Sequence, residues 1–461
     1  MKIVIGSEIS ITDPPAQLVE EIRTRLTVKN PEYQNRARRG LWLGKTSQTI
    51  SLYRVDGNSI VIPCGAAGML TPYTKNGAGV SMDLASDLVM SFHGQVPLYE
   101  YQKEAVMKMR EYSCGILQSP CGSGKTQMGI ALAAAVGHKT LWVTHTQDLL
   151  SQSYDRAVQY FPETILGKIT AGKVHIGSHI TFATVQTLSK LDLDQYRYTW
   201  GTVIVDECHR LAGSPTSVTM FYKVMSHLAA RHKYGLSATV HRSDGLIQST
   251  FAIIGPVIHK VPDEAVADKT MTVRILRRDT GVQIGRQCLD TDGTLLYSNL
   301  IPYLAEHQER NQKIVHDIIT NASHSCLILS DRLEHLRNIM TALPEELRAL
   351  SAMIDGKMTS KRARAERIQA IEDMRSGKKR FLFASYSLAK EGLDIPCLDR
   401  LFLTTPKKDY AVVTQSIGRI ARKAEGKHDA VAYDYVDDIG FCENQWKKRK
   451  TSYRKAGCEI G

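Results

Sequence analysis

The sequence SPCGSGKT at residues 119–126 has the residue types and the spacing of a site that grips a triphosphate. An apolar stretch precedes it and an amphipathic stretch follows it, which predicts a strand, a loop and a helix in succession. Gly122 and Gly124 would let backbone N–H groups converge on the phosphates, together with the first turn of the helix. Lys125 would add a point charge at the β and γ phosphates, and Thr126 would add a hydroxyl ligand for magnesium. A Gly/Ser-rich turn with an accidental lysine is the alternative.

A second candidate motif, DECH, begins at Asp206 after the apolar run TVIV. That run is typical of a buried parallel strand, and open α/β sheets bind ligands at the carboxyl ends of such strands. Asp206 would hold magnesium through its water shell, and Glu207 would orient or deprotonate an attacking water. An acidic turn after a strand is the alternative. Ser237, Ala238 and Thr239 follow another predicted strand and could relay the nucleotide state to a nucleic-acid face.

Other polar residues stand where predicted elements begin or end. The amide of Gln102 could donate to and accept from an adenine edge. Thr184, Gln186 and Thr187 follow a predicted strand, where they could bond nucleic-acid phosphates, although polar strand ends are also common without that role.

The sequence QSIGRIAR at residues 415–422 places Arg419 and Arg422 three residues apart, which predicts that they share one helix face. A guanidinium there could stabilise charge on a transferring γ-phosphate. Two solvated arginines are the alternative. The preceding EGLDIP, at residues 391–396, fits a loop that contacts both nucleotide and nucleic acid.

The elements that must position these motifs form two series. Alternating apolar strands and helices from residue 96 indicate an α/β domain with a parallel sheet. A second series starts near residue 306 and contains no second phosphate loop. Between them, residues 263–305 contain a predicted strand and an Asp-Gly turn at residues 292–293, which fits either a plain linker or a strand-separating hairpin.

Residues 1–95 resemble a separate small domain with a hairpin turn at Asp56-Gly57. Within it, residues 21–46 hold seven Lys/Arg against two Glu, beside Tyr33 and Trp42. Basic residues interleaved with aromatic ones suit a surface that contacts phosphates and stacks on bases, and a solvated charged helix face is the alternative. The candidates for nucleic-acid contact here are Arg36, Arg38 and Arg39. A basic tail, WKKRKTSYRK, stands at residues 446–455.

The composition fits an ordinary globular protein of 461 residues, with 43% hydrophobic and 23% charged residues. The formal net charge of +12 favours an anionic partner, of which nucleic acid is the commonest. The nine cysteines contain no C-x-x-C pair, so neither a disulfide framework nor a zinc site is indicated and we expect a reducing cytoplasm. We find no membrane span and no secretory signal, which predicts a protein without a membrane partner.

The ordered series LYEYQ, SPCGSGKT, THTQDLLSQ, TVQT, DECH, SAT, EGLDIP and QSIGRIAR resembles the motif series of superfamily 2 helicases over residues 96–440. The DECH box, the chain length and the N-terminal region are similar to UvsW-type phage DNA helicases, which remodel recombination and stalled-fork intermediates. The resemblance implies an α/β fold with two RecA-like parallel-sheet domains in tandem and a small N-terminal domain. It further implies ATP between the two domains, with Mg²⁺ as a cofactor, and nucleic acid bound across both.

The resemblance also implies roles for matching residues. Catalysis would fall to Lys125, Asp206, Glu207, Gln415, Arg419 and Arg422. Nucleotide binding would involve Gln102, Ser119, Pro120, Cys121, Gly122, Ser123, Gly124, Lys125, Thr126, Gly392 and Asp394, with Thr126 and Asp206 at the magnesium ion. Nucleic acid would be contacted by Thr144, Thr184, Gln186 and Thr187. Two positions depart from the pattern: Ser119 replaces a usual Gly or Ala, and Tyr99 replaces an Arg ahead of Gln102, which leaves the strength of adenine selection open.

We therefore expect an ATP-driven DNA helicase or branch-migration translocase that acts on branched or forked DNA in recombination, replication or repair, in the cytoplasm of a bacterial or phage-infected cell. An RNA helicase is disfavoured by DECH in place of DEAD and by the form of THTQDLL. A nucleotide-gated nucleic-acid clamp without sustained turnover is the alternative from another class. The expected domains are residues 1–95 (DNA-binding accessory), 96–262 (ATP-binding), 263–305 (connector), 306–440 (helicase C-terminal) and 441–461 (basic tail).

Overall fold

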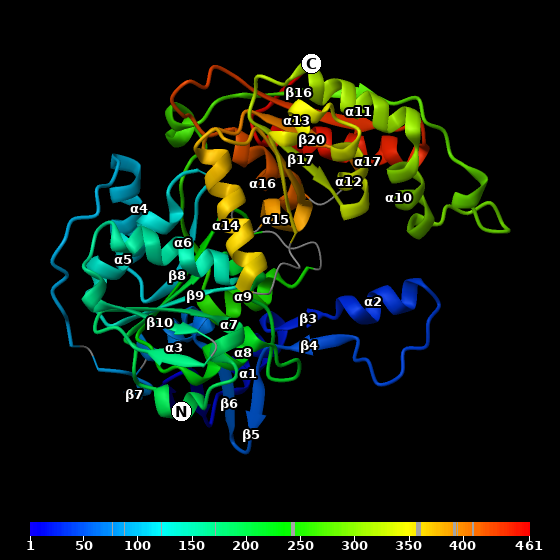
Figure 1. Ribbon diagram of the computed structural model, residues 1–461. Helices are drawn as coiled ribbons and strands as arrows, with labels where there is room; N and C mark the ends of the chain where they lie inside the picture. Colours follow the sequence, from blue (N-terminus) through cyan, green and yellow to red (C-terminus); the bar gives the residue numbers. More distant parts are fainter. Residues whose placement is uncertain are drawn as a thin grey trace. The chain divides into compact units, whose positions relative to one another are not determined.

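The computed structural model describes residues 1–75, 77–86, 88–120, 122–170, 172–240, 245–355, 361–390, 393, 395–407 and 410–461. These residues form two compact units, Met1–Ala265 and Val266–Gly461 (Figure 1). Three predicted nucleotide-binding residues, Cys121, Gly392 and Asp394, lie outside the described residues. No helix within the described part of the chain is long and apolar enough to cross a membrane.

The first unit begins with a small, mostly antiparallel sheet and short helices. Its elements are β1 (Lys2–Ile5), β2 (Glu8–Thr12), α1 (Ala16–Arg25), β5 (Arg54–Asp56), β6 (Ser59–Pro63), η1 (Cys64–Leu70), α3 (Thr71–Lys75) and β7 (Gly79–Met82). The strand order is β5-β6-β2-β1-β7. The predicted hairpin is confirmed, since Asp56 pairs with Ser59 across Gly57, whose φ of +56° suits a residue without a Cβ.

An arm made of residues 27–51 stands away from the sheets of its unit (Figure 1). It contains β3 (Thr27–Lys29), α2 (Pro31–Arg38) and β4 (Thr49–Ser51), and β3 pairs only with β4 among the described strands. The α2 sequence, PEYQNRAR, has no apolar stripe, and the helix buries none of its residues. Its first turn is capped instead by Asn30, whose side-chain oxygen accepts from the backbone N–H of Glu32 at 3.0 Å.

The rest of the first unit is an eight-stranded sheet covered by helices. Its elements are α4 (Glu100–Arg110), β8 (Cys114–Gln118), α5 (Lys125–Val136), β9 (Thr140–Thr144), α6 (Gln147–Val158), η2 (Glu163–Ile165), β10 (Leu166–Thr170), β11 (Lys173–His175), β12 (Ile180–Thr184), α7 (Val185–Leu188), η3 (Leu193–Tyr196), β13 (Thr202–Asp206), η4 (Cys208–Arg210), α8 (Met220–His227), β14 (His232–Ser237), α9 (Ile247–Ile254) and β15 (Val257–Lys260). The order is β11-β10-β12-β9-β13-β14-β8-β15, and only β11 pairs antiparallel. Every residue of β9, β12 and β13 is buried, as expected of parallel strands covered on both faces.

The two sheets of the first unit are held together by backbone contact and by a buried lysine. A Cβ on Gly65 in η1 would lie 2.3 Å from the backbone N of Gly255 and 2.4 Å from the carbonyl oxygen of Phe251, so only glycine permits this approach to α9. Lys233, in β14, is buried and donates from Nζ to the carbonyl oxygen of Ser7 at 2.8 Å. The N-terminal sheet is therefore packed firmly onto the parallel sheet.

The second unit is a seven-stranded sheet in which all pairs are parallel. Its elements are β16 (Val273–Asp279), η6 (Arg286–Cys288), α10 (Tyr297–Glu306), α11 (Gln308–Thr320), β17 (Cys326–Ser330), α12 (Leu333–Thr341), α13 (Glu345–Ala349), β18 (Ser351–Ile354), α14 (Lys361–Arg375), β19 (Phe381–Ser385), α15 (Tyr386–Lys390), β20 (Arg400–Leu403), α16 (Tyr410–Ile420), β21 (Ala430–Val436), α17 (Gly440–Lys455) and β22 (Glu459–Ile460); η5 (Glu264–Lys269) crosses the boundary between the units. The strand order is β18-β19-β17-β20-β21-β16-β22. The expected fold class, two parallel-sheet α/β domains in tandem with a small N-terminal domain, is confirmed.

Segments expected to be a connector and a tail contribute to this second sheet. The strand predicted between the two series is β16, which lies between β21 and β22. Trp446 and Tyr453, on α17, are buried in the same core as β16 and β21. The turn predicted at residues 292–293 is also present: Leu289 and Leu295 form an antiparallel bridge, and Gly293 has a φ of +76°.

Candidate nucleotide and nucleic-acid sites

The phosphate loop connects β8 to α5 as predicted. Gly122 and Gly124 adopt φ angles of +84° and +81°, which favour glycine, and Gly124 is the N-cap of α5. Ser119 and Ser123 are buried and join their hydroxyl oxygens across the loop at 2.5 Å. Ser119 also donates its backbone N–H to the carbonyl oxygen of Ser237 at 2.9 Å. Serine in place of the usual glycine therefore fits the loop and braces it through its side chain.

Gln102 lies against this loop, with both ends of its amide bonded to the backbone. Its Oε1 accepts from the N–H of Tyr99 at 2.9 Å, and its Nε2 donates to the carbonyl oxygen of Ser123 at 2.8 Å. The Tyr101 hydroxyl donates to the same oxygen at 3.0 Å. A Cβ on Gly124 would lie 2.6 Å from the Gln102 Nε2. Gln102 therefore holds α4 against the phosphate loop, and an adenine edge would have to take over one of these bonds.

The predicted acidic residues lie at the carboxyl edge of the same sheet. Asp206 ends β13 and is buried, and its Oδ1 accepts from the backbone N–H of Glu207 at 2.9 Å. Burial, and then the neighbouring charge of Glu207, raise the pKa of Asp206 to about 7, while the positive charge of Lys125 opposes that rise. The Lys125 Nζ itself lies 3.5 Å from the carbonyl oxygen of Pro120, and Thr126 follows it in the first turn of α5. The Asp206 carboxyl group is therefore buried beside a second carboxylate, and the ammonium group of Lys125 is close enough to stabilise its negative charge.

A close contact and two hydrogen bonds link the DECH residues to the SAT residues. Glu207 has a φ of +50°, a strained conformation for a residue with a side chain, and its Oε2 lies 3.2 Å from the Nδ1 of His209. The same Nδ1 lies 3.0 Å from the Oγ of Ser237, whose hydroxyl donates to the carbonyl oxygen of Thr239 at 2.6 Å. Our site prediction from sequence omitted His209, although it stands two residues after Glu207, within the DECH motif itself.

The residues predicted to contact nucleic acid at strand ends gather at one place. Thr144 and Thr184 are register partners at the ends of β9 and β12. The Thr184 hydroxyl caps α7 by accepting from the backbone N–H of Thr187 at 3.3 Å, and the two threonine hydroxyls lie 2.9 Å apart. Gln186 donates from Nε2 to the carbonyl oxygen of His145 at 2.7 Å. These four predicted residues therefore lie together at the carboxyl ends of β9 and β12, where the side chains of Thr184, Gln186 and Thr187 form local hydrogen bonds.

In the second unit, α16 carries two of the three residues predicted from QSIGRIAR. Gln415 is buried, and Arg419 donates from a guanidinium nitrogen to the carbonyl oxygen of Leu393 at 3.2 Å. The prediction that Arg422 shares a helix face with Arg419 is wrong, because α16 ends at Ile420. Arg422 lies beyond that end, in an isolated antiparallel bridge with Thr270.

The three predicted arginines of the arm differ in their surroundings. Arg36 is half-buried, with Nε 3.0 Å from the Oε1 of Glu32 and a guanidinium nitrogen 3.3 Å from the carbonyl oxygen of Trp42. Arg38 and Arg39 are exposed, and the Trp42 side chain is 85% exposed. The exposed indole of Trp42 and the exposed side chains of Arg38 and Arg39, three to four residues earlier in the chain, are available to an external partner.

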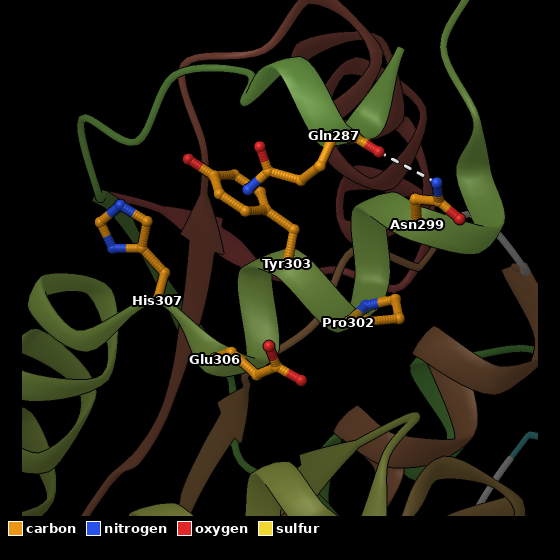
Figure 2. Close-up of a pocket in the computed structure, with 6 residues that line it drawn as sticks. All are labelled: Gln287, Asn299, Pro302, Tyr303, Glu306 and His307. Atoms are coloured by element: carbon orange, nitrogen blue, oxygen red, sulfur yellow. Dashed lines mark hydrogen bonds between the residues drawn. The ribbon is translucent and has the colours of Figure 1, made fainter. Parts of the chain in front are cut away.

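A hollow of about 400 Å³ lies on the second unit between η6 and α10 (Figure 2). Asn299 donates from Nδ2 to the carbonyl oxygen of Gln287 at 2.9 Å. The described residues that line it are Gln287, Asn299, Pro302, Tyr303, Glu306 and His307, with no lysine or arginine among them. This lining does not suit a phosphate.

Two family models and several proteins of known sequence or structure match this chain. Residues 95–242 match the family described as type III restriction enzyme, res subunit, and residues 310–424 match the helicase conserved C-terminal domain. A protein of Escherichia phage T5 named as helicase D10 is 29% identical, over 79% of this chain and 74% of its own length. A protein of Acanthamoeba polyphaga mimivirus named as an ATP-dependent RNA helicase is 26% identical, over 95% of this chain and 82% of its own. The crystal structure of T4 UvsW aligns with a TM-score of 0.42 and 19% identity, covering 100% of this chain and 99% of that one.

Proposed function

Because this chain belongs to the superfamily 2 helicases, we propose that it is an ATP-driven DNA translocase that remodels branched DNA, such as forks or junctions, in recombination, replication or repair. The observation that carries the ATP-driven part is the carboxyl edge of the first parallel sheet. There the phosphate loop follows β8, Asp206 ends β13 with Glu207 directly after it, and α5 packs against β13. The proposed motor uses this edge to bind and hydrolyse ATP.

The residues present fit a magnesium-bound triphosphate. The loop glycines leave room for backbone N–H groups to face phosphate oxygens, and Lys125 supplies a cation to the terminal phosphates. Thr126 and Asp206 would hold Mg²⁺, which neutralises phosphate charge when bound. The burial of Asp206 at this edge is consistent with the assignment, because a nearby divalent cation would offset the cost of its buried negative charge. Glu207 would accept a proton from the attacking water or orient it, and His209 would hold the Glu207 carboxylate in place.

The proposed preference for branched DNA depends on the arm. Two parallel-sheet domains suffice for movement along a strand, so recognition of a fork needs a further surface. The arm offers Arg38 and Arg39 for phosphates and Trp42 for an unpaired base at the branch point. The hairpin at residues 289–295 is a weaker candidate for this role, because its tip carries the carboxylates of Asp290 and Asp292, which repel phosphates.

Affinity for a fork and for a matched single strand tests the arm. We expect Arg38→Gln, Arg39→Gln and Trp42→Ala together to lower fork affinity more than single-strand affinity, and to flatten the slope of log affinity against log salt by about 0.9 for each lost phosphate contact. Arg23→Gln with Arg25→Gln, on the exposed face of α1, is a control that removes two cations from the same region. If the arm variant keeps the parental fork-to-single-strand ratio, the arm does not recognise the branch.

An RNA helicase is the second candidate, favoured by the name of the mimivirus relative. A nucleotide-gated clamp is the third. ATP hydrolysis measured without nucleic acid, with DNA and with RNA separates the three: we expect DNA to stimulate sustained turnover more than RNA of the same sequence does. Stronger stimulation by RNA would favour the second candidate, and a single turnover per complex would favour the third.

A further inference from the structure

We propose that the outward face of α17 is a contact surface for the phosphate backbone of duplex DNA. This α17 basic face comprises Lys447, Lys448, Lys450, Arg454 and Lys455. The inference rests on the proposed action on DNA and adds a binding surface in the second unit, apart from the strand-end motif residues.

The helix has a basic outer face and a buried inner face, and the one acidic residue on the outer face, Glu443, pairs with Arg277. At about 100° per residue, the five cations fall within an arc of about 160°, and the buried residues fall within an arc of about 120° on the opposite side. The buried residues are Cys442, Gln445, Trp446, Arg449, Ser452 and Tyr453. Arg449 belongs to the inner face, where its Nε lies 2.7 Å from the Oδ2 of buried Asp434. The core therefore fixes the direction in which the other cations point.

The cations of the α17 basic face have no acidic partners in the described part of the chain. Residues 444–458 contain no Asp or Glu at all. Elsewhere in the same unit, exposed arginines pair along their own helices, as Arg337 does with Glu334 and Arg362 with Glu366, both at 2.9 Å. Like charges three and four residues apart, such as Lys450 with its neighbours Lys447 and Arg454, destabilise a helix. An external polyanion would relieve this repulsion.

Interaction with the helix dipole accounts for only part of this charge. Cations near a helix C-terminus are stabilising, and this effect covers Arg454 and Lys455 in the last turn. It falls off within one turn, whereas Lys447 and Lys448 lie midway along the sixteen-residue helix. The helix dipole therefore does not account for the two lysines in the middle of the α17 basic face.

The surroundings favour duplex over single-stranded DNA. Of the three aromatic residues of the helix, Trp446 and Tyr453 are only 5% and 0% exposed, and Phe441 is partly buried with its ring 5.4 Å from that of Tyr297. The face therefore offers no open platform on which unpaired bases could stack. Lys447 and Lys455 are separated by about 12 Å along the helix axis, comparable with the rise of about three to four nucleotides of one strand. A row of point charges of that length suits a regular phosphate backbone.

The test compares two variants with the same loss of charge. The α17 variant carries Lys447→Gln, Lys448→Gln, Arg454→Gln and Lys455→Gln. The control carries Arg337→Gln, Arg362→Gln, Arg375→Gln and Lys378→Gln, four cations of the same unit that have acidic partners. Fluorescence anisotropy on a blunt DNA duplex and on a single strand, at several salt concentrations, gives the slope of log affinity against log salt. We expect the α17 variant to flatten the duplex slope by up to about 3.6, with a smaller change on the single strand and little change in the control.

Equal slopes for the α17 variant and the parental protein on the duplex would overturn the proposal, and so would an equal loss in the control. If the change is larger on the single strand, the surface is not a duplex site. Should the fourfold variant melt at a lower temperature than the control, Lys447→Gln with Lys448→Gln alone, expected to flatten the slope by about 1.8, decides the matter. ATP hydrolysis at saturating single-stranded DNA distinguishes a failure of the proposed function from a failure of this surface. If DNA does not stimulate hydrolysis by the parental protein, the proposed function is refuted. If DNA does stimulate it and the duplex slope of the α17 variant is unchanged, only this surface is refuted.

Discussion

Lys125 and Glu207 lie at the same sheet edge but act on different parts of the proposed reaction. Lys125→Ala removes a cation from the phosphates and leaves the core packing intact, so we expect the rate of ATP hydrolysis to fall by about 10²-fold or more with little change in melting temperature. Glu207→Gln keeps the shape of the side chain and removes the base, so ATP affinity should persist while hydrolysis is lost. Steady-state hydrolysis and binding of a fluorescent ATP analogue measure both effects. Parental turnover in Lys125→Ala would exclude the phosphate-loop assignment.

Arg422 is the second test at the residue scale. If its guanidinium stabilises the transferring phosphate, Arg422→Ala should lower DNA-stimulated hydrolysis by about 10³-fold, while DNA affinity without ATP stays near the parental value. Lys423→Ala, an exposed neighbour, is the control. An equal loss of DNA affinity would instead make Arg422 a phosphate contact on the DNA track.

The sequence predicts site residues well where a loop geometry dictates their type. Gly122 and Gly124 have the left-handed φ angles that the motif requires. Hydrogen-bond partners from distant segments were not predictable. Residue spacing does not show that the Gln102 amide bonds to Ser123, or that His209 in η4 reaches Ser237 at the end of β14. These contacts depend on strand order, which a local pattern does not contain.

At the scale of single elements, the C-terminal end of α16 depends on Lys427. Its Nζ donates to three carbonyl oxygens, at 2.8 Å to Arg422 and 2.6 Å to Leu398, and at a shorter separation to Ile420. Lys427→Met would leave these acceptors without a charged donor, so we expect a loss of roughly 1–3 kcal/mol in the free energy of unfolding. Urea denaturation measures it, with Lys423→Met as the exposed control. A loss below about 0.5 kcal/mol would show that water replaces the ammonium group.

The packing of α12 makes the second unit sensitive to acid. Burial, and then the charge of Arg310, lower the pKa of His335 from 6.5 to about 3. Its neutral ring bridges Ser330 and Asn311, at 3.1 and 2.9 Å. Between pH 6.5 and 3 the unfolded chain binds a proton that the folded chain excludes, so the free energy of unfolding falls as pH falls, by up to about 1.4 kcal/mol per pH unit.

Urea denaturation at pH 7.5 and 5.5 tests this sensitivity. His335→Gln, whose amide can bond the same partners, should reduce the acid-induced loss, whereas exposed His316→Gln should not. The same loss in all three proteins would place the acid sensitivity elsewhere, for example at His232, where burial lowers the pKa to about 4.

The limits of sequence reasoning also appear in whole elements. Apolar periodicity located most parallel strands, because strands covered on both faces are apolar throughout. It did not show that α17 is half buried, because six basic residues within ten dominate the composition while Trp446 and Tyr453 carry the packing. The composition of a basic segment predicts that it is exposed to solvent. Its burial becomes predictable only when its apolar residues are assigned to one face of a helix.

At the scale of the whole molecule, the N-terminal sheet and the eight-stranded sheet form one compact unit, Met1–Ala265, which the sequence did not predict. Gly65 packs against the backbone of α9, and Lys233 ties β14 to the N-terminal sheet. Removing residues 1–95 would therefore expose part of the first unit's core, and variants confined to the arm are the sounder probe of branch recognition.

The measurement that tests the central claim most directly follows a fluorescently labelled movable fork, with and without ATP. We predict that the parental protein converts the fork into regressed duplex products only when ATP is hydrolysed, and that Lys125→Ala binds the fork without converting it. Conversion at equal rates without ATP would contradict the account, and so would DNA-stimulated ATP hydrolysis that leaves every fork unchanged.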